Sequence, residues 1–161
     1  MIRRHATFAV VATLIAMLLA ACGSGGPVRR VSEPAASIQQ LTVRADGRWD
    51  VQLRLNNFSS MAMRFGDARL DIAFDGTAVA RIEANPGIEV GPESADVFTT
   101  TLVPLPEGRA RMATALADGR GVSYAMTGTL QAAPQDGGSR EYRIKRNSAL
   151  SPVPGLPGVL R

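Results

Sequence analysis

The sequence predicts an all-β fold, an antiparallel sandwich of two sheets. Apolar and polar residues alternate with a period of two in several short segments. Turn-forming residues separate these segments at intervals of about 8–12 residues, a spacing typical of sandwiches. About seven strands and one short helix account for the pattern.

The first predicted hairpin begins at Leu41-Thr42-Val43 and turns at Asp46-Gly47. A turn dipeptide flanked by alternating segments is a strong local signal for a hairpin. The second strand, 49–56, is expected to be half-buried, with Trp49 facing the core. Its apolar face consists of Trp49, Val51, Leu53 and Leu55.

A second hairpin is predicted around Asp75-Gly76-Thr77. Side-chain parity favours a three-residue loop, because a two-residue loop would turn Arg81 inward. Opposite charges then face each other on the exposed side and help to fix the register. The opposed pairs are Phe74–Ala78, Ile72–Ala80, Leu70–Ile82, Asp71–Arg81 and Arg69–Glu83.

Further strands are predicted over 96–103, 122–130 and 140–146. The composition of 107–117 indicates a short helix, with a strand that continues into the next hairpin as the alternative. Three prolines in the tail 151–161 remove too many donors for a strand ladder, so an irregular, mobile tail is expected. Since the cysteine and tryptophan signature of antibody domains is missing, the immunoglobulin-like (Ig-like) sandwich is expected to be of the fibronectin-like kind.

The amino-terminal stretch predicts export from the cytoplasm. Arg3 and Arg4 precede an uncharged run over 8–21. As a helix this run rises about 21 Å, which is short of the roughly 30 Å hydrocarbon core of a bilayer. Such a run is typical of a signal peptide rather than of a membrane span.

The run ends in Leu19-Ala20-Ala21-Cys22, which resembles the lipobox of bacterial lipoproteins. The resemblance implies recognition of Leu19, Ala20 and Ala21 by a signal peptidase and cleavage before Cys22. It also implies a diacylglycerol and an N-acyl chain such as palmitate on that cysteine, and three acyl chains hold a protein on a membrane essentially permanently. The alternative is an ordinary secretory signal with Cys22 as a stray thiol.

The expected location is the periplasmic face of the outer membrane of a Gram-negative envelope. Gly23 stands where an aspartate typically signals inner-membrane retention, and this step again rests on the resemblance. The chain is divided into four predicted parts. These are the signal peptide 1–21, the lipidated cysteine with a flexible tether 22–37, the β-sandwich domain 38–150 and the Pro-rich tail 151–161.

Composition excludes several classes of function. Without Arg3 and Arg4 the chain has 16 basic and 14 acidic residues, a net charge of +2, and the basic residues are scattered, so nucleic-acid binding is not expected. His5 and Cys22 are the only residues of their types, one lost with the signal peptide and one capped by lipid. This excludes the usual zinc sites, histidine-dependent nucleophiles and disulfides, so neither a metal, another cofactor nor a small-molecule substrate is expected.

Several motifs, in order, resemble the late embryogenesis abundant type 2 family, also called the WHy domain. The resemblance covers about residues 37 to 150, and Asn57 stands where the family prefers proline. It implies an Ig-like or fibronectin-like sandwich and protection of other proteins during desiccation or stress, with no active-site chemistry. The motifs are Asn56-Asn57-Phe58, Asp75-Gly76, Gly91-Pro92-Glu93-Ser94, Val97–Val103 and Tyr124–Gly128.

Three groups of residues are candidate sites. Asn56-Asn57 could bind a ligand, but such residues more often end a strand in an Asx turn. Asp67, Asp71 and Asp75 are about 13 Å apart along a strand, too far for paired carboxylate catalysis, and are expected to be solvated. Glu89, Glu93 and Asp96 could gather a hard cation, but they lack EF-hand spacing.

The most plausible binding surface predicted from the sequence is an apolar patch of Met61, Met63 and Phe65, with a short edge strand as the alternative. The leading hypothesis is a non-enzymatic lipoprotein that shields other envelope proteins, with the membrane and those proteins as its partners. The second hypothesis is an adaptor or assembly subunit of an envelope complex.

Overall fold

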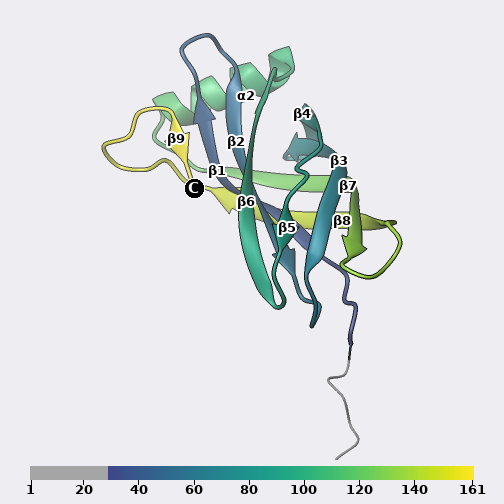
Figure 1. Ribbon diagram of the computed structural model, residues 1–161. Helices are drawn as coiled ribbons and strands as arrows, with labels where there is room; N and C mark the ends of the chain where they lie inside the picture. Colours follow the sequence, from purple (N-terminus) through teal and green to yellow (C-terminus); the bar gives the residue numbers. More distant parts are fainter. Residues whose placement is uncertain (1–28) are drawn as a thin grey trace, which may run out of the picture.

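The computed structural model describes residues 29–161 and confirms the predicted all-β class (Figure 1). The predicted signal peptide, the lipobox and Cys22 lie outside these residues. The elements are β1 (Ala35–Val43), β2 (Trp49–Asn57), β3 (Met63–Phe74), β4 (Thr77–Ala84), β5 (Glu89–Val90), β6 (Ser94–Leu102), α2 (Pro106–Ala117), β7 (Val122–Pro134), β8 (Arg140–Leu150) and β9 (Val159–Leu160).

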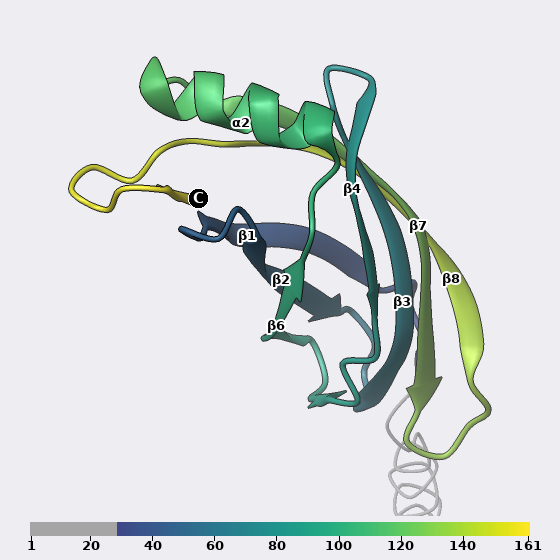
Figure 2. The ribbon, with the colours of Figure 1, turned by 90° about the horizontal axis from the view of Figure 1, so that it is seen from above.

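Two antiparallel sheets form the sandwich. One has the strand order β6-β2-β1-β9, and the other has the order β4-β3-β7-β8, with β5 paired to β3. Figure 2 shows the sheets as two layers that face each other. Within residues 29–161, no helix has the length and apolar character needed to cross a membrane.

The hairpin of β1 and β2 is confirmed. Val43 pairs with Trp49 across the turn, and the predicted apolar face of β2 is buried. Trp49 stacks on Phe74 of the other sheet, with ring centroids 5.9 Å apart. β1 begins at Ala35, and Pro34 before it is also buried, so residues 35–37 belong to the sandwich and not to the predicted tether.

The hairpin of β3 and β4 has the predicted register over most of its length, including Asp71 opposite Arg81 and Leu70 opposite Ile82. The predicted pairing of Phe74 with Ala78 is wrong, because Phe74 pairs with Thr77 across a two-residue turn. A bulge after Ile72 absorbs the extra residue and restores the parity that the longer loop was expected to supply. Val79 and Ala80 are consequently both buried.

The carboxyl-terminal tail is ordered, which corrects the prediction of an irregular segment. Val159 and Leu160 form β9 and pair with Thr42 and Leu41 of β1. Leu160 is fully buried, and the Arg161 N–H and carbonyl bond the Ser151 carbonyl and N–H at 2.9 and 2.6 Å. Pro152 forms an isolated bridge with Leu160, where Ser151 and Val153 on either side donate the N–H bonds, and Pro154 and Pro157 lie in the loop before β9, so the prolines cost the ladder no donor.

The predicted helix is confirmed as α2, which follows β6 and precedes β7. Pro106 occupies its first turn, where a missing N–H costs nothing. Met112 and Ala115 are buried, and Gly108 is seated on β4, since a Cβ there would lie 2.6 Å from the Val79 carbonyl oxygen. α2 therefore closes one end of the sandwich (Figure 1).

Candidate contact surface

The predicted apolar patch of Met61, Met63 and Phe65 does not lie on the surface of the protein. Met63 and Phe65 are fully buried in the core, and Met61 is half-buried in the preceding loop. A bulge between Phe65 and Ala68 switches the parity of β3. Because of it, the side chains on both sides of the bulge point inward, although their sequence spacing places them on opposite faces.

Asn57 organises the corner at the end of β2, which confirms the structural interpretation. Its side-chain Nδ2 donates to the carbonyl oxygens of Met61, Val90 and Gly91 at 2.8, 3.1 and 2.8 Å. Its Oδ1 accepts the Ser59 N–H at 2.8 Å, an Asx turn. Asn57 is 1% exposed, so its amide is occupied by the protein itself and does not face a ligand.

Two further family-motif positions, Tyr124 and Gly128, also have structural roles. The Tyr124 hydroxyl accepts the Ile38 N–H at 3.0 Å, a buried hydrogen bond between the two sheets. The donor lies at the bulge of β1, where the ladder leaves an N–H without a strand partner. Gly128 allows β7 to approach β3 closely, since a Cβ there would lie only 2.0 Å from the Arg69 carbonyl oxygen.

Three of the six acidic candidates, Asp67, Asp71 and Glu93, are engaged by nearby side chains, and Asp96 accepts the Val97 N–H. Asp67 accepts from Asn85 at 2.7 Å, and Asp71 accepts from Arg81 at 2.6 Å. This hydrogen bond, with the charge of Asp71, raises the pKa of the Arg81 guanidinium. Glu93 pairs with Arg30 at 3.0 Å. Across the described residues, no group of three acidic, histidine or cysteine side chains is placed to hold a metal ion.

Large exposed apolar side chains gather at the two ends of the sandwich. Val103 and Leu105, on the link from β6 to α2, are 64% and 49% exposed, and Leu156 in the loop before β9 is 49% exposed. We call the end of the sandwich that carries α2 and these three residues the α2 end. Val31 and Phe58, at the opposite end, are 43% and 51% exposed.

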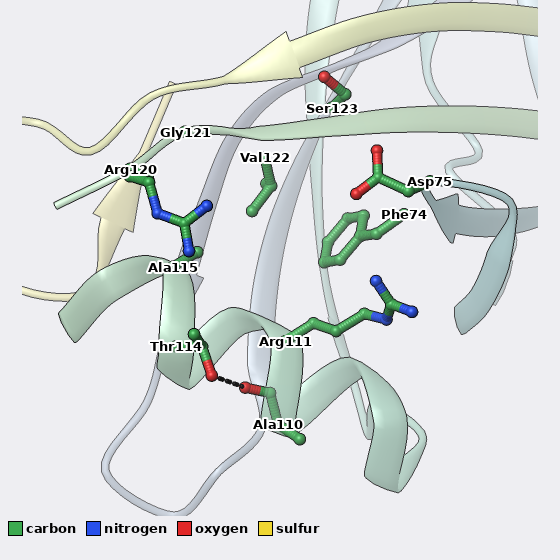
Figure 3. Close-up of a pocket in the computed structure, with 10 residues that line it drawn as sticks. All are labelled: Phe74, Asp75, Ala110, Arg111, Thr114, Ala115, Arg120, Gly121, Val122 and Ser123. Atoms are coloured by element: carbon green, nitrogen blue, oxygen red, sulfur yellow. Dashed lines mark hydrogen bonds between the residues drawn. The ribbon is translucent and has the colours of Figure 1, made fainter. Parts of the chain in front are cut away.

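A cavity of about 380 Å³ lies between α2 and the start of β7 (Figure 3). Phe74 and Val122 form its apolar floor, and Arg111 and Arg120 extend along it. Arg111 donates to Thr77 Oγ1 at 3.1 Å, and Arg120 pairs with Asp118 at 2.6 Å. Asp75 and Ser123 also line it, so the cavity presents guanidinium, carboxylate and hydroxyl groups that can hydrogen-bond a ligand.

A second hollow, of about 490 Å³, lies between the carboxyl end of α2 and the loop that leads to β9. Leu116, Val153, Leu156 and Val159 line it. This groove is mainly apolar and exists only because the tail folds back onto β1. Sequence reasoning missed it, since the run of prolines indicated an irregular tail.

The edge strand β8 carries four exposed cations, a cluster that the scattered composition did not suggest. Arg140, Arg143, Lys145 and Arg146 form no ion pair in the part of the chain that the structure describes. Charged side chains on an edge strand oppose pairing with a strand of another molecule. The edge of this sheet is thereby protected from aggregation.

The comparisons with known proteins agree with this fold. The profile of the late embryogenesis abundant protein family (LEA_2) matches residues 52–148. No curated protein matches the chain significantly. A solution structure from Arabidopsis thaliana is 8% identical with a TM-score of 0.50, covering 80% of this chain and 83% of that protein.

Two further structures resemble the chain. A candidate late embryogenesis abundant protein is 12% identical with a TM-score of 0.42, covering 96% of this chain and 87% of its own. A protein from Archaeoglobus fulgidus is 17% identical with a TM-score of 0.41, covering 77% of this chain and 98% of its own.

The fold is a sandwich of two antiparallel sheets, and the motif residues Asn57, Tyr124 and Gly128 have structural roles in it. The chain belongs to the late embryogenesis abundant protein family (LEA_2). Membership favours a stress-related role without catalysis.

Proposed function

We propose that this protein is a lipid-anchored, non-enzymatic protein of the bacterial cell envelope that shields other envelope proteins during stress. The anchor is the acylated Cys22 of the Leu19–Cys22 lipobox, on the periplasmic face of the outer membrane. Family membership supports the stress-related part of the proposal. The shielding surface is the α2 end.

One observation carries the choice of surface. Val103 and Leu105, before the amino end of α2, and Leu156, in the apolar groove at its carboxyl end, expose about half or more of their side chains. Arg29, through which the chain leads back to Cys22, pairs with Asp136 in the turn between β7 and β8, at the other end of the sandwich (Figure 1). Exposed apolar residues turned away from the anchor can cover apolar surface on a damaged client.

The test is protection of a freeze-labile enzyme by the purified lipidated protein in vesicles. We expect the wild type to preserve activity better than an equal mass of albumin, and Leu105→Ser with Leu156→Ser to lose much of that benefit. Arg143→Ser with Lys145→Ser is the matched control, since both side chains are exposed along β8 and belong to neither end of the sandwich. Protection no better than albumin would contradict the shielding role.

The groove beside α2 also favours a second candidate function, that of an adaptor with one partner. A hollow of about 490 Å³ suits one defined cluster of apolar side chains on a single partner better than it suits many different clients. Photo-crosslinking from position 156 in intact envelopes separates the two functions. One stoichiometric product supports the adaptor, whereas a dispersed set of products supports shielding.

A further inference from the structure

We propose that the end of the sandwich that carries Phe58 and Val31 lies in the interfacial layer of the membrane that holds the protein. This inference rests on the proposed anchor at Cys22 and adds an orientation to it. Phe58 and Val31 are the contact residues, and phospholipid is the partner.

The two apolar residues lie on neighbouring segments that are fixed to each other. Arg30 donates its N–H to Ser60 Oγ at 2.8 Å and accepts the Ser60 N–H at 3.0 Å. Ser32 donates its N–H to Ser59 Oγ at 3.0 Å. Residues 30–32 therefore run beside 58–60, and Val31 and Phe58 belong to one surface.

That surface has the composition of a membrane interface. Phe58 is 51% exposed and Val31 is 43% exposed, although both are large and apolar. Arg29 and Arg30 flank them, with side chains 69% and 62% exposed. Within residues 29–161 their ion pairs are to the exposed Asp136 and Glu93, and Glu33 is a further exposed carboxylate at this end. Aromatic side chains beside arginines are typical of the level of the lipid head groups.

Chain length brings this end to the membrane. Arg29 stands seven positions after Cys22, so their Cα atoms are at most about 25 Å apart in any conformation. The folded body begins earlier than the sequence indicated, because Ser32 and Pro34 already pack against it.

The α2 end is held away from the lipid by the same geometry. β2 runs from Trp49, near α2, to Asn57, beside Phe58, and its length is about 26 Å. The anchored end thus meets the interfacial layer while Leu156 stays on the far side of the sandwich. This leaves the α2 end free to meet other proteins.

Fluorescence quenching by lipids tests the orientation. Lipidated full-length protein is reconstituted into phosphatidylethanolamine–phosphatidylglycerol vesicles that contain brominated lipid, with Phe58→Trp, Val31→Trp or Leu156→Trp. Trp49 is 1% exposed and supplies a constant background that the wild type measures. Leu156 is the matched control, with 49% exposure at the opposite end.

We expect the tryptophans at positions 58 and 31 to be quenched roughly twofold more than the one at 156, and to emit at shorter wavelength. Equal quenching at the two ends, or none at 58 and 31, overturns the inference. Mass spectrometry of Cys22 separates this failure from that of the anchor. An acylated but unquenched protein overturns the orientation alone, and an unacylated cysteine overturns both proposals.

Discussion

The two ends of this sandwich are built by different means. At the Asn57 end, one buried amide bonds three carbonyls and one N–H, and residues 30–32 are stitched to the adjoining loop by backbone and serine hydrogen bonds. At the α2 end, a helix and a folded-back tail cover the core, leaving two hollows and three large apolar side chains in water.

This difference predicts which positions of the fold tolerate substitution and which do not. A buried polar group that loses its partner costs far more than an exposed apolar residue that is replaced. The Asn57 end therefore tolerates little variation at its centre, whereas the α2 end can vary its surface without unfolding. Contact with other proteins is best carried by the second kind of end.

Among the substitutions considered, replacing Asn57 should lower the free energy of unfolding the most. Asn57→Ala leaves the Ser59 N–H and the carbonyls of Val90 and Gly91 without their partner, and we expect a loss of about 3 kcal/mol in the free energy of unfolding. Urea unfolding measures it. Asn56→Ala is the control, because Asn56 is only half-buried and should cost less than about 0.5 kcal/mol. Equal losses would show that Asn57 does not organise the corner.

A buried hydrogen bond from the Ile38 N–H to the Tyr124 hydroxyl joins the two sheets, and substitutions of two tyrosines measure its contribution to stability. Tyr124→Phe leaves the Ile38 N–H without an acceptor in the core, so we expect a loss of about 2 kcal/mol. Tyr142→Phe is the matched change, because the buried Tyr142 hydroxyl has no hydrogen-bond partner among residues 29–161. It should be neutral or stabilising in thermal unfolding, and a loss as large as that of Tyr124→Phe would refute the assignment.

The seating of α2 depends on Gly108. In Gly108→Ala the new methyl group meets the Val79 carbonyl oxygen at 2.6 Å and the Val79 Cβ at 2.9 Å. Overpacking of this kind costs about 2 kcal/mol, and the gain in helix propensity returns about 1 kcal/mol, so we expect a net loss of about 1 kcal/mol. Amide hydrogen exchange should be faster in α2 but unchanged at Asn57. Gly138→Ala, with open space around it, is the control.

The smallest effect is expected at the turn between β1 and β2. The Arg48 N–H donates to Asp46 Oδ1 and lowers the pKa of that carboxyl, helped by the charges of Arg44 and Arg48 and opposed by desolvation. The resulting stability is present above the unfolded pKa near 4 and is lost as the pH falls through the lower folded pKa. Thermal melts from pH 5 to 2 should show this loss for the wild type and not for Asp46→Asn. Parallel pH profiles would rule out the contribution.

The sequence by itself determined what depends on neighbours along the chain. Alternation placed Trp49, Val51, Leu53 and Leu55 in the core, and the Asp-Gly dipeptides marked both hairpins. The composition of 107–117 marked the helix. Each of these signals acts within a few residues, and in these segments the long-range pairings of the fold agree with it.

Only the tertiary structure decided the parity of β3, the place of the tail and the exposed surface. The bulge before Ala68 lets Met63 and Phe65 share the buried face with Ala68, and although Gly66 is a local hint of a bulge, the partner strands set its position. Leu160 is buried because β1 offers it an unpaired edge. Which apolar side chains stay in water follows from these long-range pairings, and so the contact surface could be located only in the folded chain.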